Sequence, residues 1–326
     1  METHIVNNIF SVTHQGFDAL AIAVFRYQYQ HNPVYQQWVN LLNIIPAAVT
    51  SPGEIPFMPV SFFKTHKVYA AAEPPDITFE SSGTTQSSNS QHHVRHLDLY
   101  MKSCIKGFEE LYGDLANYAI LGLLPSYLER KGSSLVVMVE EFIKRSNDAR
   151  SGFYLYEHDR LSHTLRELES EQKKTLLIGV TFGLLDFVAQ YPLRLRYTIV
   201  METGGMKGRR KEMIRSEVHD ILRKGFATDN VHSEYGMTEM LSQAYSMGNG
   251  LFKPVPWLKV LVRDEEDPLS ISGIGRGIIN IIDLANVYSC SFLATDDAGL
   301  IYPDGTFEVL GRVDNSDIRG CSLMLA

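Results

Sequence analysis

Residues 80–90 read ESSGTTQSSNS, and this stretch says more about the fold than any other part of the chain. It follows a strand-like segment at 76–79, and it places hydroxyl side chains on both sides of one glycine. Backbone N–H groups and hydroxyls in such a loop can converge on a polyanion, most often phosphate. The Walker pattern GxxxxGK[ST] does not occur in the sequence, so the loop is of another type. A solvated Ser/Thr-rich turn is the alternative for the loop by itself.

Composition narrows the class of protein. The chain has 326 residues, 44% hydrophobic and 21% charged, which is ordinary for a globular protein. Its net charge of −8 and pI near 5.8 argue against a general nucleic-acid binder, whose surface would be basic. The cysteines Cys104, Cys290 and Cys321 lack CxxC spacing, which excludes a disulfide framework and a zinc ribbon and fits a reducing cytosol.

We therefore expect a soluble, cytoplasmic protein. No apolar run approaches the roughly 20 residues of a membrane span. The N-terminus lacks the basic and then apolar pattern of a signal peptide.

Strand and helix patterns alternate through the middle of the chain. Apolar strand patterns occur at 118–123, 175–180 and 195–201, and helical patterns at 134–145 and 211–224. Such alternation predicts βαβ units, and hence an α/β fold of mainly parallel sheets covered by helices.

The two ends of the chain have a different texture. Helical spacing dominates residues 1–55, whereas short strand patterns separated by turn signals begin near Trp257. We expect a single domain over 1–326, with a helical N-terminal part, an α/β core at 56–256 and a β-rich sublobe at 257–326.

Two later segments offer groups for ligand contacts. Gly204-Gly205 follows a strand pattern, where paired glycines let a planar ring approach the backbone. Residues 233–239, SEYGMTE, bring together an aromatic face, a glycine, a hydroxyl and a carboxylate. These groups suit base stacking, a phosphate contact and Mg²⁺ held by one carboxylate. Asp297 and Arg312 add a carboxylate and a cation, although each segment by itself reads as a turn between strands.

In this order, the segments resemble the adenylate-forming superfamily of acyl-CoA synthetases, peptide-synthetase adenylation domains and luciferase-type enzymes. The resemblance implies a nucleotide site made of the phosphate loop Ser81, Ser82, Gly83, Thr84 and Thr85, the adenine-lining Gly204 and Gly205, the core motif Tyr235, Gly236, Met237, Thr238 and Glu239, and the ribose-binding Asp297 with Arg312.

Within the superfamily, the chain is most similar to the bacterial-bioluminescence acyl-protein synthetases, a branch related to phenylacetate-CoA ligases. PFMP at 56–59, Phe63-Lys64, TGGMKGR at 203–209 and DIRGC at 317–321 carry this likeness. In that branch a cysteine near the C-terminus accepts the acyl group from the adenylate, and Cys321 stands at a matching place.

The sequence departs from the family pattern in two ways. Gln86 replaces the usual glycine of the phosphate loop, and no lysine follows it. His92, His93 and Arg95 are candidates for the missing charge, with a helix start as the alternative. A metal site at His92-His93-x-x-His96 has no acidic or cysteine partner nearby in the sequence.

The second departure is at the end of the sequence. Most relatives continue into a C-terminal lid domain with a catalytic lysine, whereas this sequence ends soon after Gly311-Arg312. The resemblance then implies either weaker adenylation or a lysine supplied by a partner subunit.

The implied function is the ATP- and Mg²⁺-dependent activation of a carboxylic acid, above all a fatty acid, as an acyl-adenylate that passes to a thiol. The implied catalytic residues are Glu239, Thr84 and Cys321, and Glu239 would also hold the metal. The acceptor thiol could be the chain's own cysteine, CoA or a carrier protein. An acyl- or aryl-CoA ligase and a non-catalytic nucleotide- or acyl-binding subunit of a larger complex are the alternatives.

Overall fold

The computed structural model describes residues 2–81, 89–124, 132–204 and 213–313. Its helices are α1 (Glu2–Asn8), α2 (His14–His31), α3 (Pro33–Leu41), α4 (Phe62–Thr65), α5 (Leu97–Tyr112), α6 (Ser134–Arg145), α7 (His158–Ser170), α8 (Thr181–Gln190) and α9 (Arg215–Phe226). Its strands are β1 (Met58–Pro59), β2 (Ile77–Glu80), β3 (Gln91–Val94), β4 (Ala119–Leu123), β5 (Gly152–Phe153), β6 (Thr175–Gly179), β7 (Thr198–Glu202), β8 (His232–Tyr235), β9 (Ala244–Ser246), β10 (Leu251–Pro254), β11 (Leu258–Arg263), β12 (Ile271–Ser272), β13 (Gly275–Asp283), β14 (Phe292–Ile301) and β15 (Phe307–Arg312).

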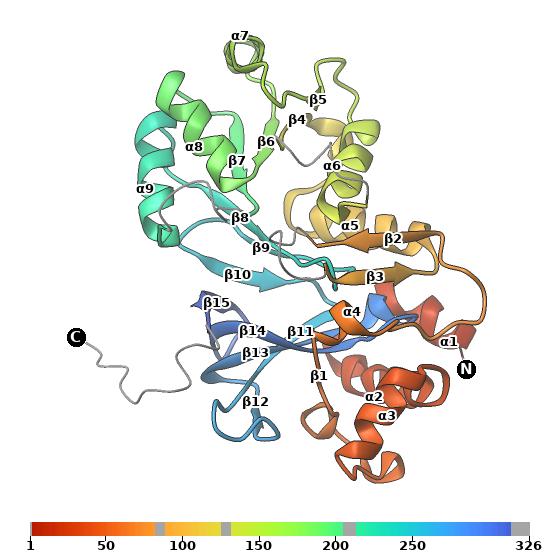
Figure 1. Cartoon of the computed structure of the whole chain (residues 1–326). Coiled ribbons are helices and arrows are strands. Elements are labelled where there is room, and N and C mark those ends of the chain that lie inside the picture. Colours follow the sequence, from red (N-terminus) through yellow and green to blue (C-terminus); the bar gives the residue numbers. More distant parts are fainter. Residues whose placement is uncertain (1, 82–88, 125–131, 205–212, 314–326) are drawn as a thin grey trace.

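The described strands form one 13-stranded sheet in the order β12-β11-β13-β14-β15-β10-β9-β8-β7-β6-β4-β5, with β1 paired to β14. β2 and β3 make a separate antiparallel hairpin that lies between the upper and lower parts of the molecule in Figure 1. The strands β5, β4, β6, β7 and β8 run parallel, and the strands from β8 through β15 to β12 pair antiparallel. The predicted α/β class, with a parallel core and a β-rich C-terminal part, is confirmed.

Helices cover both faces of the parallel strands, and this explains their continuous apolar sequences. Ile120 and Leu176 pack in the core cluster that includes residues of α5 and α6. Their neighbours Leu121 and Leu177 point to the opposite face and pack with residues of α7, α8 and α9. Figure 1 shows α5 and α6 on one side of these strands and α8 and α9 on the other.

The structure corrects three local expectations. The segment around Asp297 is not a turn, because it forms the interior of β14 and pairs with both β13 and β15. The segment has a weak local preference for a strand, and its pairing with neighbouring strands on both sides overrides that preference. His92 and His93 lie in β3 and not at a helix start, since α5 begins at Leu97. The strand predicted from residue 195 begins only at Thr198.

In the part of the chain that the structure describes, no helix combines the length and the apolar character needed to cross a membrane.

Candidate functional site

A tyrosine, a carboxylate and a guanidinium meet where β8, β14 and β15 approach one another. The hydroxyl of Tyr235, the last residue of β8, donates to Oδ2 of Asp297 at 2.8 Å. Nε of Arg312 lies 3.3 Å from Oδ1 of the same carboxylate, and the strand register pairs these two residues. Asp297 is only 7% exposed, whereas the Arg312 side chain is 59% exposed. Arg312 is therefore available to a ligand, and Asp297 is held from both sides.

The Tyr235 ring is set by packing. It meets the rings of Phe252 and Phe307 edge-on, with centroids 5.9 and 5.7 Å away. Burial, followed by the negative charge of Asp297, raises the pKa of Tyr235 well above its usual value. The phenol therefore stays protonated at neutral pH and acts as a donor to Asp297.

The last residue of the core motif, Glu239, lies beside the base of the predicted phosphate loop. Its side chain contacts Ser90, and it is 8% exposed. Ser90 and Ser81 clamp the two ends of the loop, because the Ser90 N–H donates to the Ser81 hydroxyl at 2.9 Å and the Ser81 N–H donates to the Ser90 carbonyl at 3.1 Å. Burial raises the pKa of Glu239, and the positive charges of Arg312 and Lys64 oppose that rise.

Lys64 is a site residue that the functional interpretation of the sequence missed. It lies exposed on the short helix α4, and its charge acts on Glu239. The Phe63-Lys64 pair was visible in the sequence only as part of a family likeness. By contrast, Arg95, a candidate for the missing charge, pairs with Glu2 and Glu73.

His92 ties the loop hairpin to the core motif. Its Nδ1 donates to the Thr238 carbonyl at 2.7 Å, and its Nε2 lies 2.9 Å from Oδ1 of Asn286. The Asn286 amide in turn donates to the Glu239 carbonyl at 2.7 Å. Burial lowers the pKa of His92 to about 4. These contacts give His92 a structural role, and the described residues contain no cluster of three His, Cys, Asp or Glu side chains able to hold a metal.

Gly204 has a left-handed backbone conformation, with φ of +74°, which favours glycine at this position. Its N–H donates to Oε2 of Glu202 at 2.8 Å, and its carbonyl accepts from the Thr181 N–H at 2.8 Å. Oε1 of Glu202 lies 3.4 Å from Nε of Arg215 and 3.6 Å from Nε2 of His219. Burial by itself would raise the pKa of Glu202, but these partners outweigh it and lower the pKa to about 2. The ionised carboxylate therefore fixes the glycine turn.

Sequence reasoning missed Glu202, Arg215 and His219. The only available signal was a glutamate at the end of a strand, separated from the glycine pair by Thr203 alone.

The middle of the core motif is accessible to solvent. Gly236 is exposed, and Met237 and Thr238 are half-buried. A Cβ added to Gly236 would lie 2.5 Å from Oε1 of Glu234, so a side chain at this position would collide with the carboxyl group.

A buried carboxylate secures the chain just beyond the motif. Asp283 accepts hydrogen bonds from the N–H groups of Leu241 and Ser242 at 2.8 and 3.0 Å, and from the Ser242 hydroxyl at 2.6 Å. The N–H of Ala285 adds a fourth bond at 3.1 Å.

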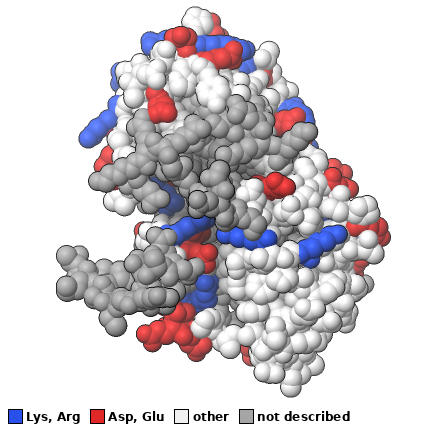
Figure 2. Space-filling view, viewed as in Figure 1, with Lys and Arg blue, Asp and Glu red and all other residues white. Residues whose placement is uncertain are grey.

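Not every predicted residue can be placed. Ser82, Gly83, Thr84 and Thr85 of the loop, Gly205 of the glycine pair, and Cys321 lie outside the described residues. The described ones, namely Ser81, Gly204, Tyr235 to Glu239, Asp297 and Arg312, gather near the β8 end and the loop base. On the face shown in Figure 2, Lys and Arg side chains with Asp and Glu among them form a band across the middle of the molecule.

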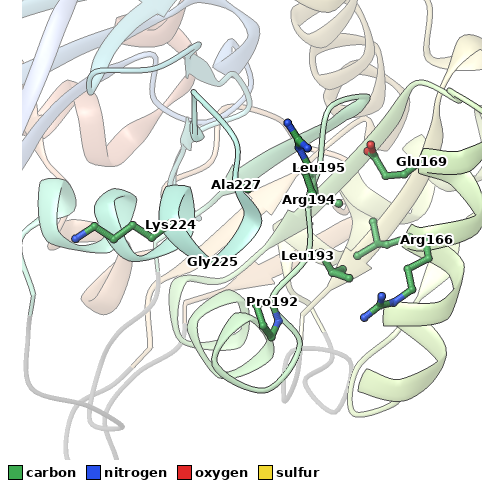
Figure 3. A pocket seen from close by; sticks show the side chains of 10 residues that line it. Arg166, Glu169, Pro192, Leu193, Arg194, Leu195, Lys224, Gly225 and Ala227 are labelled. Atoms are coloured by element: carbon green, nitrogen blue, oxygen red, sulfur yellow. The ribbon is translucent and has the colours of Figure 1, made fainter.

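A separate groove of about 490 Å³ lies beside α7, the segment at 192–195 and the end of α9 (Figure 3). Arg166, Arg194 and Lys224 contribute to its lining, together with Glu169. The Glu169 carboxylate already accepts from the backbone N–H groups at 196 and 197. None of the described residues of the predicted site lines this groove, so we do not assign the site to it.

Comparison with known proteins establishes the fold. No protein-family model and no curated protein matches the chain. A 2-hydroxyisobutyryl-CoA ligase solved with 2-HIB-AMP and CoA matches with a TM-score of 0.66 and 12% identity, over 95% of this chain and 71% of its own. ATP-bound MatB from Rhodopseudomonas palustris matches with a TM-score of 0.51 and 16% identity, over 75% of this chain and 50% of its own.

A long-chain-fatty-acid-CoA ligase from Archaeoglobus fulgidus gives a TM-score of 0.50 and 13% identity, over 72% of this chain and 51% of its own. The chain thus spans about half the length of the last two proteins. The chain therefore has the fold of the N-terminal domain of adenylate-forming acyl-CoA ligases, the superfamily that its sequence motifs resemble.

Proposed function

We propose that this chain activates a carboxylic acid with ATP, giving an acyl-adenylate and pyrophosphate, and passes the acyl group to a thiol with release of AMP. The observation that carries the proposal is the convergence of Glu239, the Ser81–Ser90 clamp and the Tyr235–Asp297–Arg312 set. Arg312 links these groups, because it pairs with Asp297 and its charge also acts on Glu239.

Each group has a distinct part in binding the nucleotide. Ser82, Gly83, Thr84 and Thr85 would hold the phosphates, and Gly204 with Gly205 would line the adenine. Tyr235 would bound the adenine, and Asp297 with Arg312 would bind the ribose.

Glu239 fits a role as the Mg²⁺ ligand. Mg²⁺ is commonly bound by one or two carboxylates together with substrate phosphates, and a bare carboxylate beside phosphate would be repulsive. Glu239 is one buried carboxylate next to the phosphate-loop base, with Lys64 and Arg312 as nearby cations. When bound, Mg²⁺ would neutralise charge on the phosphates.

The chemical step demands positioning more than proton transfer. The ionised carboxylate of the acid attacks the α-phosphorus, the bond to the bridging oxygen of the β-phosphate breaks, and pyrophosphate leaves. The protein's contribution is to align the two reactants and to stabilise the charge that develops on the phosphate. Among the described cations, Arg312 and Lys64 support this part of the proposal, because their charges act on Glu239.

The acceptor thiol is not one of the described cysteines. Cys104 and Cys290 are both fully buried, and burial raises both pKa values, that of Cys290 to about 12. Such thiols are poor nucleophiles because the thiolate is the reactive form. We therefore propose Cys321, CoA or a carrier-protein thiol as the acceptor, with Cys321 favoured by the likeness to acyl-protein synthetases.

An ATP–pyrophosphate exchange assay over fatty, aryl, hydroxy and amino acids tests the first half-reaction. Acid-dependent exchange is the expected result. Retained ATP binding without exchange for any acid would instead identify a non-catalytic nucleotide-binding subunit. Adding CoA to an active mixture and measuring acyl-CoA separates a CoA ligase from a self-acylating protein. A fatty acid remains the substrate that the family likeness favours.

A further inference from the structure

The carboxyl group of Glu234, next to the proposed site, has no hydrogen-bond or ion-pair partner in the part of the chain that the structure describes. It precedes Tyr235 on β8, so its side chain points to the opposite face of the strand. Among the described residues, no hydrogen bond or ion pair engages Glu234, and the charge that acts on it is that of another carboxylate, Glu202. Burial and Glu202 together raise the pKa of Glu234 to about 8. At neutral pH the unliganded carboxyl group is therefore mainly protonated, and a cation bound beside it would favour the ionised form.

Two further polar groups without partners lie beside it. The β8–β9 register places Tyr245 directly across from Glu234, and Gln243 is two residues earlier on the same chain segment. The Tyr245 hydroxyl and Oε1 of Gln243 are buried and have no hydrogen-bond partner among the described residues. Nearly all buried polar atoms in native proteins are satisfied. Three neighbouring polar groups without a partner among the described residues therefore indicate a place where a polar ligand group could bind.

Gly236 of the core motif has no side chain that would cover Glu234 and Gln243. Gly236 is exposed, and the position that its Cβ would occupy lies 2.5 Å from Oε1 of Glu234 and 3.5 Å from Cγ of Gln243. A side chain there would cover the carboxyl group from the side on which Gly236 is exposed. Gly236 lies between Tyr235 and Thr238 in the core motif, and both of these residues belong to the proposed nucleotide site. The cluster of Glu234, Gln243 and Tyr245 therefore adjoins the place where the acid would react.

We propose that the acid activated at this site carries a protonated amine, which Glu234, Gln243 and Tyr245 bind. An ammonium group has three N–H donors, one for each of these three side chains. Its positive charge would also offset the repulsion between Glu234 and Glu202 and favour ionised Glu234. A hydroxyl group supplies one donor and no charge, and an alkyl chain supplies neither. The inference rests on the proposed function for the reaction, but not for the binding of the amine.

The test compares acids that differ only in this group. Hexanoic acid, its ω-hydroxy derivative and its α- and ω-amino derivatives are assayed for ATP–pyrophosphate exchange with the wild-type protein. We expect at least one amino derivative to exceed both other acids in kcat/KM by about a hundredfold, because a site built for a polar group rejects analogues that lack it. Equal or better use of hexanoic or hydroxyhexanoic acid overturns the inference.

Variants then locate the preference. Glu234→Gln and Tyr245→Phe should lower kcat/KM for the amino acid by about tenfold or more, mainly through KM, and so reduce the ratio of kcat/KM for the amino acid to that for hexanoic acid. Tyr245→Phe is the safeguard against misfolding, since it removes a hydroxyl that has no partner. The matched control is Tyr112→Phe. Its ring lies 5.7 Å from that of Tyr245, but its hydroxyl is already paired with Nδ1 of His232 at 3.1 Å.

A binding measurement tests the amine site independently of the proposed ATP-dependent activation. Thermal shifts are recorded with the amino derivatives alone, without ATP, for the wild type and Glu234→Gln. A shift in the wild type that Glu234→Gln abolishes supports the amine site even if no acid supports exchange, in which case the proposed function fails. No shift, or the same shift in both proteins, contradicts the amine site whatever the exchange assay shows.

Discussion

Replacing Glu234 with glutamine should make the protein's stability less sensitive to alkaline pH. Burial, and then the charge of Glu202, raise the pKa of Glu234 from 4.5 to about 8. A carboxyl group with a raised pKa binds its proton more tightly in the folded state than in the unfolded state. The contribution of Glu234 to the free energy of unfolding should therefore be largest below pH 4.5, fall as the pH rises to about 8, and level off above it. Glutamine has no proton to lose and should not show this fall.

The size of the effect follows from the shift in pKa. At about 1.4 kcal/mol per pKa unit, a rise from 4.5 to about 8 corresponds to at most roughly 5 kcal/mol. Because Glu234 is only partly buried, solvent screening reduces this, and we expect about 2 kcal/mol. The stability of Glu234→Gln relative to the wild type should thus increase by about 2 kcal/mol between about pH 5 and about pH 9.

Urea unfolding at a series of pH values measures this difference, and Glu202→Gln is the control with the opposite sign. The pKa of Glu202 is lowered to about 2, so its ionised form stabilises the fold above pH 4.5 and that stability is lost as the pH falls toward 2. The penalty of Glu202→Gln should therefore shrink in acid. A stability difference between Glu234→Gln and the wild type that stays constant from pH 5 to pH 9, or that changes in the other direction, would refute the reasoning.

Further predictions concern the rest of the site. Glu239→Gln should reduce pyrophosphate exchange by about 10²–10³-fold, the cost of losing one electrostatic stabiliser, and exchange at the wild-type rate would remove this carboxylate from the mechanism. Tyr235→Phe deletes the hydrogen bond to Asp297 and should lower the free energy of unfolding, measured in urea, by about 1–3 kcal/mol. It should also weaken ATP binding measured by calorimetry. An unchanged Kd for ATP would mean that the position of Asp297 does not depend on the tyrosine. Asp283→Ala leaves the N–H groups of Leu241 and Ser242 without a buried acceptor and should lower the free energy of unfolding by about 3–5 kcal/mol. A loss below about 1 kcal/mol in urea unfolding would contradict a stabilising role of Asp283. Cys321→Ser should abolish a hydroxylamine-sensitive acyl label formed with ATP, Mg²⁺ and labelled acid, and a label that persists in mass spectra would place the acyl group elsewhere.

The sequence by itself determined the fold class. The runs at 118–123 and 175–180 are continuously apolar because helices bury both faces of β4 and β6, and that property is visible in a short window. The helix over 134–145 was predicted with the bounds that α6 has, since its apolar spacing is local. The order of the motifs was also readable, and it indicated the superfamily whose fold the chain has.

Only the tertiary structure decided how the site residues work together. Tyr235 and Asp297 are 62 positions apart, and Arg215 bonds the carbonyl of Val309 across 94 positions, so no local pattern could pair them. Strand pairing on both edges turned an apparent turn around Asp297 into the interior of β14.

The tertiary structure also decided the charge states of Glu202 and Glu234. In the sequence, Glu202 and Glu234 are two glutamates near strand ends, and no local pattern indicates the charge state of either one. Folding gives Glu202 an arginine, a histidine and a backbone N–H as partners, which lower its pKa to about 2. It leaves Glu234 with burial and a neighbouring negative charge, which raise its pKa to about 8. Burial and the sign of nearby charges set the protonation of a carboxyl group, and both exist only once distant segments have come together.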